Sequence, residues 1–109
     1  IFSGDDPSFL NLLMMGGHGV ISVAANILPK EISNICSNFS RGDYDEALEQ
    51  NKKLENIYDL IFIESNPVPV KWMLYKMKMI ENSLRLPLVS LDEKYRDNIY
   101  TEMLKLGLL

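Results

Sequence analysis

Several residue classes are scarce in this sequence, and each scarcity excludes a class of protein. The single cysteine, Cys36, excludes an internal disulfide and a cysteine-based zinc site, so a reducing cytoplasm is the expected compartment. Positive charge is also scarce, since the sequence has 11 Lys and Arg but 15 Asp and Glu, which gives a net charge of −4. Nucleic-acid binding needs a basic stripe and is therefore not expected. No uncharged apolar run approaches the roughly 20 residues of a bilayer span, so no membrane contact is expected either.

The remaining composition is that of an ordinary globular protein. Hydrophobic residues make up 47% and charged residues 24% of 109 residues, which is enough for one small domain or for part of a larger one. The chain opens on Ile1 with no basic leader segment, in the middle of what the pattern predicts to be a strand. We therefore expect it to be part of a longer protein.

The first 26 residues predict a strand, a helix and a second strand. Ile1–Ser3 is the end of a strand, and Asp6 followed by Pro7 predicts the N-cap of a helix over Ser8–Met15. The two glycines that follow the helix end it. Gly19–Val23 is a short β-branched run without polar alternation, typical of a strand covered on both faces. A strand, a helix and a strand in this order predict two parallel strands.

The rest of the chain predicts helices with apolar residues at three- and four-residue spacing. The first two helices are expected over Ile27–Phe39 and over Tyr44 to about Ile63, the second after a capping box of Asp43 and Glu46. A third helix is expected from Asn66-Pro67 through Trp72 to Ile80, and a connector follows over Leu84–Val89. The last helix is expected to follow a capping box of Ser90 and Glu93 and to end at Gly107. Gly42 is expected to end the first of these helices. Two parallel strands do not form a stable sheet alone, because buried strands need neighbours at both edges. This imbalance favours the carboxyl-terminal portion of a larger α/β protein.

Five segments together resemble the dihydrodipicolinate synthase family, also called 4-hydroxy-tetrahydrodipicolinate synthase. They are SGDD (3–6), GGHGVISVAAN (16–26), ESNPVPVKW (64–72), RLPL (85–88) and LGLL (106–109). The resemblance covers the whole chain in order. The sibling N-acetylneuraminate lyase shares the fold, but the Gly4-Asp5-Asp6 and Asn66–Trp72 segments favour the synthase.

The resemblance implies a (β/α)8 barrel with an added helical domain. Residues 1–26 would be the end of the barrel, with its seventh and eighth strands, and residues 27–109 the last barrel helix and the helical domain. The family condenses pyruvate with aspartate semialdehyde, through a Schiff base on a lysine of the sixth strand, in lysine biosynthesis. A complete barrel takes about 250 residues, so this chain would hold no catalytic residue and be inactive alone. The partners expected for the parent enzyme are these two substrates, the remainder of the barrel and further copies in a homotetramer. No cofactor and no metal ion are expected.

Three residues are candidates for substrate binding. Ile21 matches the family position whose main chain lines the pyruvate pocket, and the alternative is a plain barrel-core isoleucine. Gly4 would let the backbone approach the substrate closely. Asp6 would orient the aldehyde substrate, and the alternative is that it only caps the following helix.

Other polar groups are expected to be structural. The turn Gly16–Gly19, with an incidental His18, leads into a strand and not into a helix N-terminus, which disfavours a phosphate site. Lys71 is expected to be a surface or snorkelling lysine and not a Schiff-base nucleophile, and Cys36 to pack as a small hydrophobe. Met15 is a candidate for a subunit contact. Core or interface positions are expected for Trp72, Met73, Met77 and Met79.

Two other functions stay open at this point. The chain could be a segment of another pyruvate-dependent class I aldolase, such as N-acetylneuraminate lyase. It could also be a free-standing helical interaction module without catalytic activity, whose exposed strand edges would promote association.

Overall fold

The computed structural model describes all residues 1–109 and is mostly helical. Its elements, in chain order, are β1 (Phe2–Ser3), α1 (Phe9–Met14), β2 (Gly19–Val20), a 3-10 helix η1 (Ala24–Asn26), α2 (Pro29–Ser40), α3 (Tyr44–Lys52), α4 (Glu55–Ile61), α5 (Val68–Lys76) and α6 (Glu93–Lys105). None of these helices combines the length and apolar character that a bilayer crossing requires.

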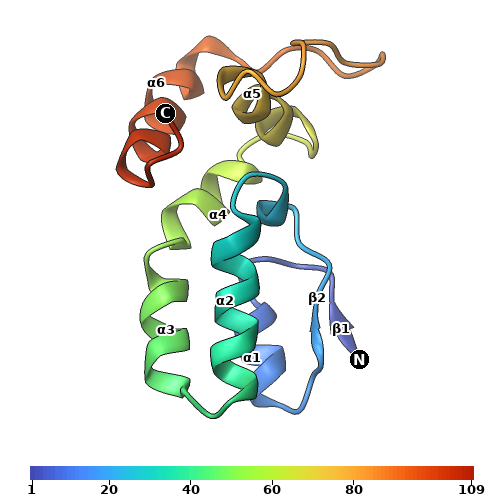
Figure 1. The fold of residues 1–109 in the computed structure, drawn as a ribbon. Coiled ribbons are helices and arrows are strands. Elements are labelled where there is room, and N and C mark those ends of the chain that lie inside the picture. Colours follow the sequence, from blue (N-terminus) through green and yellow to red (C-terminus); the bar gives the residue numbers. More distant parts are fainter.

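The two strands form a parallel pair, as predicted. Phe2 pairs with Gly19 and Ser3 with Val20, and these two strands are the whole sheet. Two further amides extend the pairing, since His18 N–H donates to the Ile1 carbonyl at 2.8 Å and Ile21 N–H donates to the Ser3 carbonyl at 2.8 Å. Figure 1 shows β1 and β2 side by side, with α1 and α2 packed on one side of them.

The second strand is shorter than the predicted Gly19–Val23 run. It ends at Val20, and Val23 already has helical angles as the N-cap of η1. The amides of Val23 and Ala24 donate to the carboxylate of Asp6. Because these two amides are turned toward Asp6, they are withdrawn from any strand pairing and the chain curls into a 3-10 turn.

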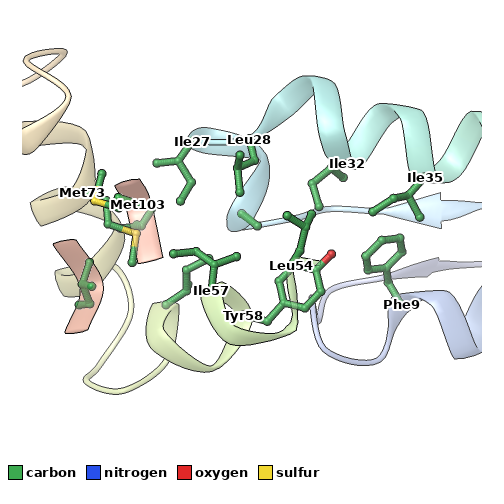
Figure 2. Packing of buried hydrophobic residues seen from close by; sticks show 14 of the residues in the cluster. Phe9, Ile27, Leu28, Ile32, Ile35, Leu54, Ile57, Tyr58, Met73 and Met103 are labelled. Carbon is green, nitrogen blue, oxygen red and sulfur yellow. The ribbon is translucent and has the colours of Figure 1, made fainter. Parts of the chain in front are cut away.

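A single cluster of 20 buried hydrophobic residues extends through the molecule. In Figure 2 these side chains form a row that runs from Phe9 and Ile35 near the strands, past Leu54, to Met73 and Met103. In Figure 1 the strands and α1, α2 and α3 make one end of an elongated body of 41 × 27 × 22 Å, and α5 and α6 make the other. Helix η1 joins the two ends, because it contacts α2, α4 and α5.

The single helix predicted from Tyr44 to about Ile63 is two helices. Helix α3 ends at Lys52 and α4 begins at Glu55, with the buried Leu54 at the break. The stripe of Ala47, Leu54, Tyr58 and Ile61 is buried as predicted. Helix α3 packs along α2, whereas α4 packs against η1, α5 and α6. One straight helix could not follow both sets of neighbours, so the chain bends between them.

Helix ends marked by glycine are where the sequence predicts them, but most side-chain caps are not. Gly16, Gly42 and Gly107 adopt positive φ angles of 99°, 86° and 75° directly after a helix. Asp43 does hold the N-cap position of α3, yet its side chain accepts no capping bond and instead lies 3.5 Å from Nε of Arg41. The predicted capping box is therefore wrong.

The caps of the last two helices are also different from the prediction. Pro67 and not Asn66 occupies the N-cap of α5, and Asp92 instead of Ser90 caps α6, accepting from Lys94 N–H at 3.0 Å. Helix α5 ends at Lys76, so the exposed Met79 lies beyond it and not on its buried face. The connector over residues 84–89 is irregular, as predicted.

Candidate functional site

The carboxyl ends of β1 and β2 lie together at one edge of the parallel pair. Gly4 and Asp6 follow β1, and Ile21 follows β2, whose last residue pairs with Ser3. The structure therefore brings together all three residues that the sequence marks as candidates for substrate binding. In parallel α/β folds this edge is where ligands bind.

Asp6 is the one buried carboxylate in this group. It is only 1% exposed, and both of its oxygens accept hydrogen bonds from the chain after β2. Oδ2 accepts from the amides of Val23 and Ala24 at 3.0 Å each, and Oδ1 accepts from the hydroxyl of Ser22. A buried carboxylate is tolerated when donors replace its lost water, and bonds to a charged acceptor are about twice as strong as neutral ones.

Ser22 completes this arrangement. Its Oγ donates to Asp6 and accepts from the amide of Ala25 at 3.0 Å. The amides of three consecutive residues at the start of η1 are therefore bound by two side chains, and the negative charge lies where a helix N-terminus favours it. We refer to Asp6, Ser22 and the amides of residues 23–25 as the Asp6 clamp.

The prediction that Asp6 caps the first helix is wrong. The N-cap position of α1 is Ser8, which makes no side-chain capping bond, and its hydroxyl donates to Asp5 at 2.5 Å. Asp6 instead caps a helix 18 residues further along the chain, at Ala24. Its contact with a substrate stays a prediction.

The main chain beside the Asp6 clamp is open. Ile21 donates its N–H to Ser3, but its carbonyl oxygen accepts no hydrogen bond from any group of residues 1–109, and its side chain is 77% exposed. Gly4 makes no backbone hydrogen bond, and a Cβ atom at Gly4 would have no neighbour within 4 Å. These free main-chain groups can bind a polar ligand that approaches the strand ends.

Tyr58 lies near the inner side of this group. Burial, reinforced by the negative charge of Asp6, raises the pKa of Tyr58 far above its usual value. Its hydroxyl donates to Asn51 Oδ1 at 2.9 Å, and its ring meets Phe9 edge to face. Tyr58 is therefore a neutral hydrogen-bond donor in the core.

The remaining candidates are located as follows. His18 lies in the turn before β2, on the opposite edge from the Asp6 clamp, with Nδ1 2.8 Å from the amino group of Ile1. Lys71 is half-buried on α5 and makes no hydrogen bond or ion pair through its amine. Burial raises the pKa of the half-buried Cys36, which packs against the core and is a poor nucleophile. Met15 is 83% exposed.

The large apolar residues on α5 and directly after it belong only partly to the core. Trp72 and Met73 are buried as predicted, Met77 is half-buried and Met79 is exposed. No group of three His, Cys, Asp or Glu side chains in residues 1–109 is placed to hold a metal ion.

Ser22 is the residue that sequence reasoning missed. A serine before a small-residue helix start is a typical N-cap signal. The predicted strand over residues 19–23 concealed it, because a serine inside a strand has no capping role.

Comparison with known proteins identifies relatives along the whole chain. The dihydrodipicolinate synthetase family matches residues 1–105. The 4-hydroxy-tetrahydrodipicolinate synthase of Nitrosomonas europaea is 43% identical over 108 residues, which are 99% of this chain and 37% of that protein. The chain thus spans little more than a third of the curated relatives that it matches.

Solved structures of the same enzyme are similar to this chain. Dihydrodipicolinate synthase from Thermotoga maritima matches with a TM-score of 0.97 at 40% identity, over 99% of this chain and 37% of that chain. The enzyme from Acinetobacter baumannii, solved in complex with pyruvate, matches with a TM-score of 0.94 at 40% identity over the same shares.

Proposed function

The chain belongs to the dihydrodipicolinate synthetase family, and from this premise we propose that residues 1–109 are the carboxyl-terminal part of a 4-hydroxy-tetrahydrodipicolinate synthase. The observation that carries the proposal is the identity of 43% over 99% of the chain to an enzyme of that name. The similarity covers both the strand region and the helical region.

The reaction of the parent enzyme would be a class I aldolase condensation. Pyruvate would form a Schiff base with a lysine, and the resulting enamine would attack the carbonyl carbon of L-aspartate 4-semialdehyde in the diaminopimelate route to lysine. The pyruvate complex of the Acinetobacter baumannii relative supports pyruvate as a substrate. No lysine of this chain lies on β1, on β2 or on the short segments that directly follow them, so the nucleophilic lysine would come from a segment outside residues 1–109.

The division of the fold follows from this proposal. Residues 1–26 would supply the seventh and eighth strands of a (β/α)8 barrel, and residues 27–109 the last barrel helix and the helical domain. The parallel β1–β2 pair and its lack of other strands support this division. The exposed side chains of Ile1, Phe2 and Ile21 would then be covered by neighbouring strands or by substrate.

The residues proposed to build the substrate site of this chain are Gly4, Asp6 and Ile21. The open carbonyl of Ile21 and the open backbone of Gly4 lie at the carboxyl ends of the strands, which is the catalytic face of a barrel. They would form part of the pocket wall. The exposed Met15 would contribute to a subunit contact in a homotetramer.

A chimeric enzyme tests the proposal. In the Nitrosomonas europaea synthase, the 37% of the chain that matches would be replaced by residues 1–109. We expect the chimera to condense pyruvate with aspartate semialdehyde in a coupled assay with the next reductase of the route, and the isolated 109-residue chain to show no turnover. A chimera that is folded but inactive on these substrates would contradict the proposal, as would turnover by the isolated chain.

A further inference from the structure

We propose that Asp6 is a positioning residue for the condensation, which acts through the main chain of Ile21 without touching a substrate. The inference rests on the proposed function. It assigns to Asp6 a different role from the orientation of the aldehyde, because the structure shows what both carboxylate oxygens bind.

Both oxygens of the Asp6 carboxylate are already bound within the chain. Asp6 is 1% exposed and accepts from Ser22 Oγ and from the amides of Val23 and Ala24. To orient an aldehyde, Asp6 would have to give up at least one of these bonds. Giving up such a bond would leave a buried donor without a partner, which is destabilising. The neighbouring Asp5, in contrast, is exposed and its carboxylate accepts only from Ser8.

The Asp6 clamp also holds one end of the segment that carries the open carbonyl of Ile21. Ile21 is held on one side by the bond of its own N–H to Ser3, and on the other side by the clamp, which begins at Ser22. Its carbonyl belongs to the peptide unit between these two anchors and accepts no bond within the chain. Figure 1 shows that this short segment links β2 to the helices around η1. Releasing the clamp would free one of the two anchors and let the peptide unit rotate.

The strand β2 also ends earlier than its side chains favour. Val20, Ile21 and Val23 are β-branched, yet the strand stops at Val20. The side-chain bonds of Asp6 and Ser22 to the amides of residues 23–25 are what replaces strand pairing there. Without the carboxylate, the β-branched residues would favour a longer strand, in which successive carbonyls point in opposite directions.

The experiment uses the chimera described above with Asp6→Asn, and with Asp5→Asn as the matched control. Asparagine has one acceptor oxygen and an NH2 group, so it cannot accept from all three donors. We expect kcat/KM for pyruvate to fall by about 10- to 100-fold, because displacement of a binding group by about 1 Å costs up to 100-fold. The KM for the aldehyde should change little, and Asp5→Asn should leave both unchanged.

Hydrogen exchange separates this role from substrate contact. Without any substrate, a peptide over residues 19–27 should exchange faster in Asp6→Asn than in the control, because the amides of Val23 and Ala24 lose their acceptor. Ser22→Ala is the milder second variant in case Asp6→Asn fails to fold. It should change the exchange and the pyruvate kinetics in the same direction, and the double variant should be no worse than Asp6→Asn alone, since both residues act through one network.

Each outcome decides one of the proposals. If Asp6→Asn raises only the KM for the aldehyde and leaves exchange unchanged, Asp6 is a substrate contact and the inference is overturned. Unchanged pyruvate kinetics in an active chimera also overturn it, while the proposed function stands. A folded chimera that is inactive before any substitution removes the proposed function, and the inference with it.

Discussion

The two ends of the molecule are stabilised in different ways. At the strand end, apolar side chains of Ile1, Phe2 and Ile21 face outward, and the main chain is open at Gly4 and Ile21. At the helical end, Trp72, Met73 and Met103 are buried in a continuous core. The helical end is therefore enclosed by its own side chains, whereas the strand pair leaves apolar side chains and main-chain groups open.

The same contrast appears within single residue types. Phe9 is completely buried between α2 and α4, whereas Phe2 is 66% exposed on β1. Asp6 is buried by a network that ends a strand, whereas Asp5 beside it is exposed. Substituting the buried and the exposed member of such a pair compares how much each contributes to the unfolding free energy.

The largest expected effect is that of Phe9→Ala. Removing this buried ring leaves a cavity beside Tyr58 and Ile35, which costs about 3 to 5 kcal/mol. Phe2→Ala is the matched control and should change the unfolding free energy by less than about 0.5 kcal/mol, because its ring is mostly in water. Urea denaturation of the 109-residue chain, followed by far-ultraviolet circular dichroism, measures both. Equal losses for the two variants would abolish the contrast between core and strand end.

The second expected effect is that of Gly17→Ala. A Cβ atom at Gly17 would lie 2.7 Å from Leu12 Cγ and 2.9 Å from the Leu12 carbonyl oxygen, so the end of α1 would have to move. We expect a loss of about 1 to 3 kcal/mol in the unfolding free energy, typical of overpacking. Gly4→Ala, with nothing within 4 Å of its Cβ position, should be nearly neutral for stability. An unchanged unfolding free energy in Gly17→Ala would contradict this expectation, because it would show that the turn can move to accept a Cβ atom at no cost.

The third pair compares two aspartates at helix N-caps. Asp92 accepts from Lys94 N–H at 3.0 Å, so Asp92→Ala should lower the unfolding free energy by about 1 kcal/mol. Asp43 occupies the same position on α3 without a capping bond and has only an exposed ion pair with Arg41. Asp43→Ala should therefore cost less than about 0.5 kcal/mol. Thermal denaturation of both variants ranks them, and the reverse order would contradict the assigned caps.

The smallest expected effect at neutral pH is that of Tyr58→Phe. Loss of the hydrogen bond to Asn51 costs about 0.5 kcal/mol, because the half-buried Asn51 side chain can turn to water. The pH profile is more informative. Burial raises the pKa of Tyr58 in the folded chain, so its contribution is complete below about pH 10, the ordinary tyrosine pKa. Above that pH the unfolded chain loses its proton first, and the unfolding free energy decreases.

Tyr58→Phe should therefore flatten the alkaline decrease in stability. The exposed Tyr44 supplies the matched variant, and Tyr44→Phe should retain the alkaline decrease of the parent chain. Denaturation midpoints measured from neutral pH to about pH 11 decide the matter. An unchanged alkaline decrease in Tyr58→Phe would mean that another group causes it.

The sequence predicted the candidate site as a set of residues but not as a network. Gly4, Asp6 and Ile21 were named from the resemblance, and the parallel strands place them at one edge. The partners of Asp6 were not predictable from local pattern, because they lie 16 to 18 residues further along the chain. The same limit applies to the capping boxes predicted at Asp43 and Ser90. Asp43 is the N-cap of α3 but its side chain makes no capping bond, and the N-cap of α6 is Asp92 instead of Ser90.

The sequence by itself determined the parallel pairing of the strands, the apolar stripes of the helices and the ends of three helices at Gly16, Gly42 and Gly107. The parallel direction follows from the order of strand, helix and strand along the chain. The helix stripes and helix ends depend on residues within one or two turns and on the φ angles that only glycine adopts easily. The tertiary structure alone decided that β2 stops at Val20, that the helix after Asp43 bends at Leu54, and that Asp6 binds Ser22 and the start of η1. Each of these depends on a neighbour distant in sequence, whose position exists only once the chain has packed.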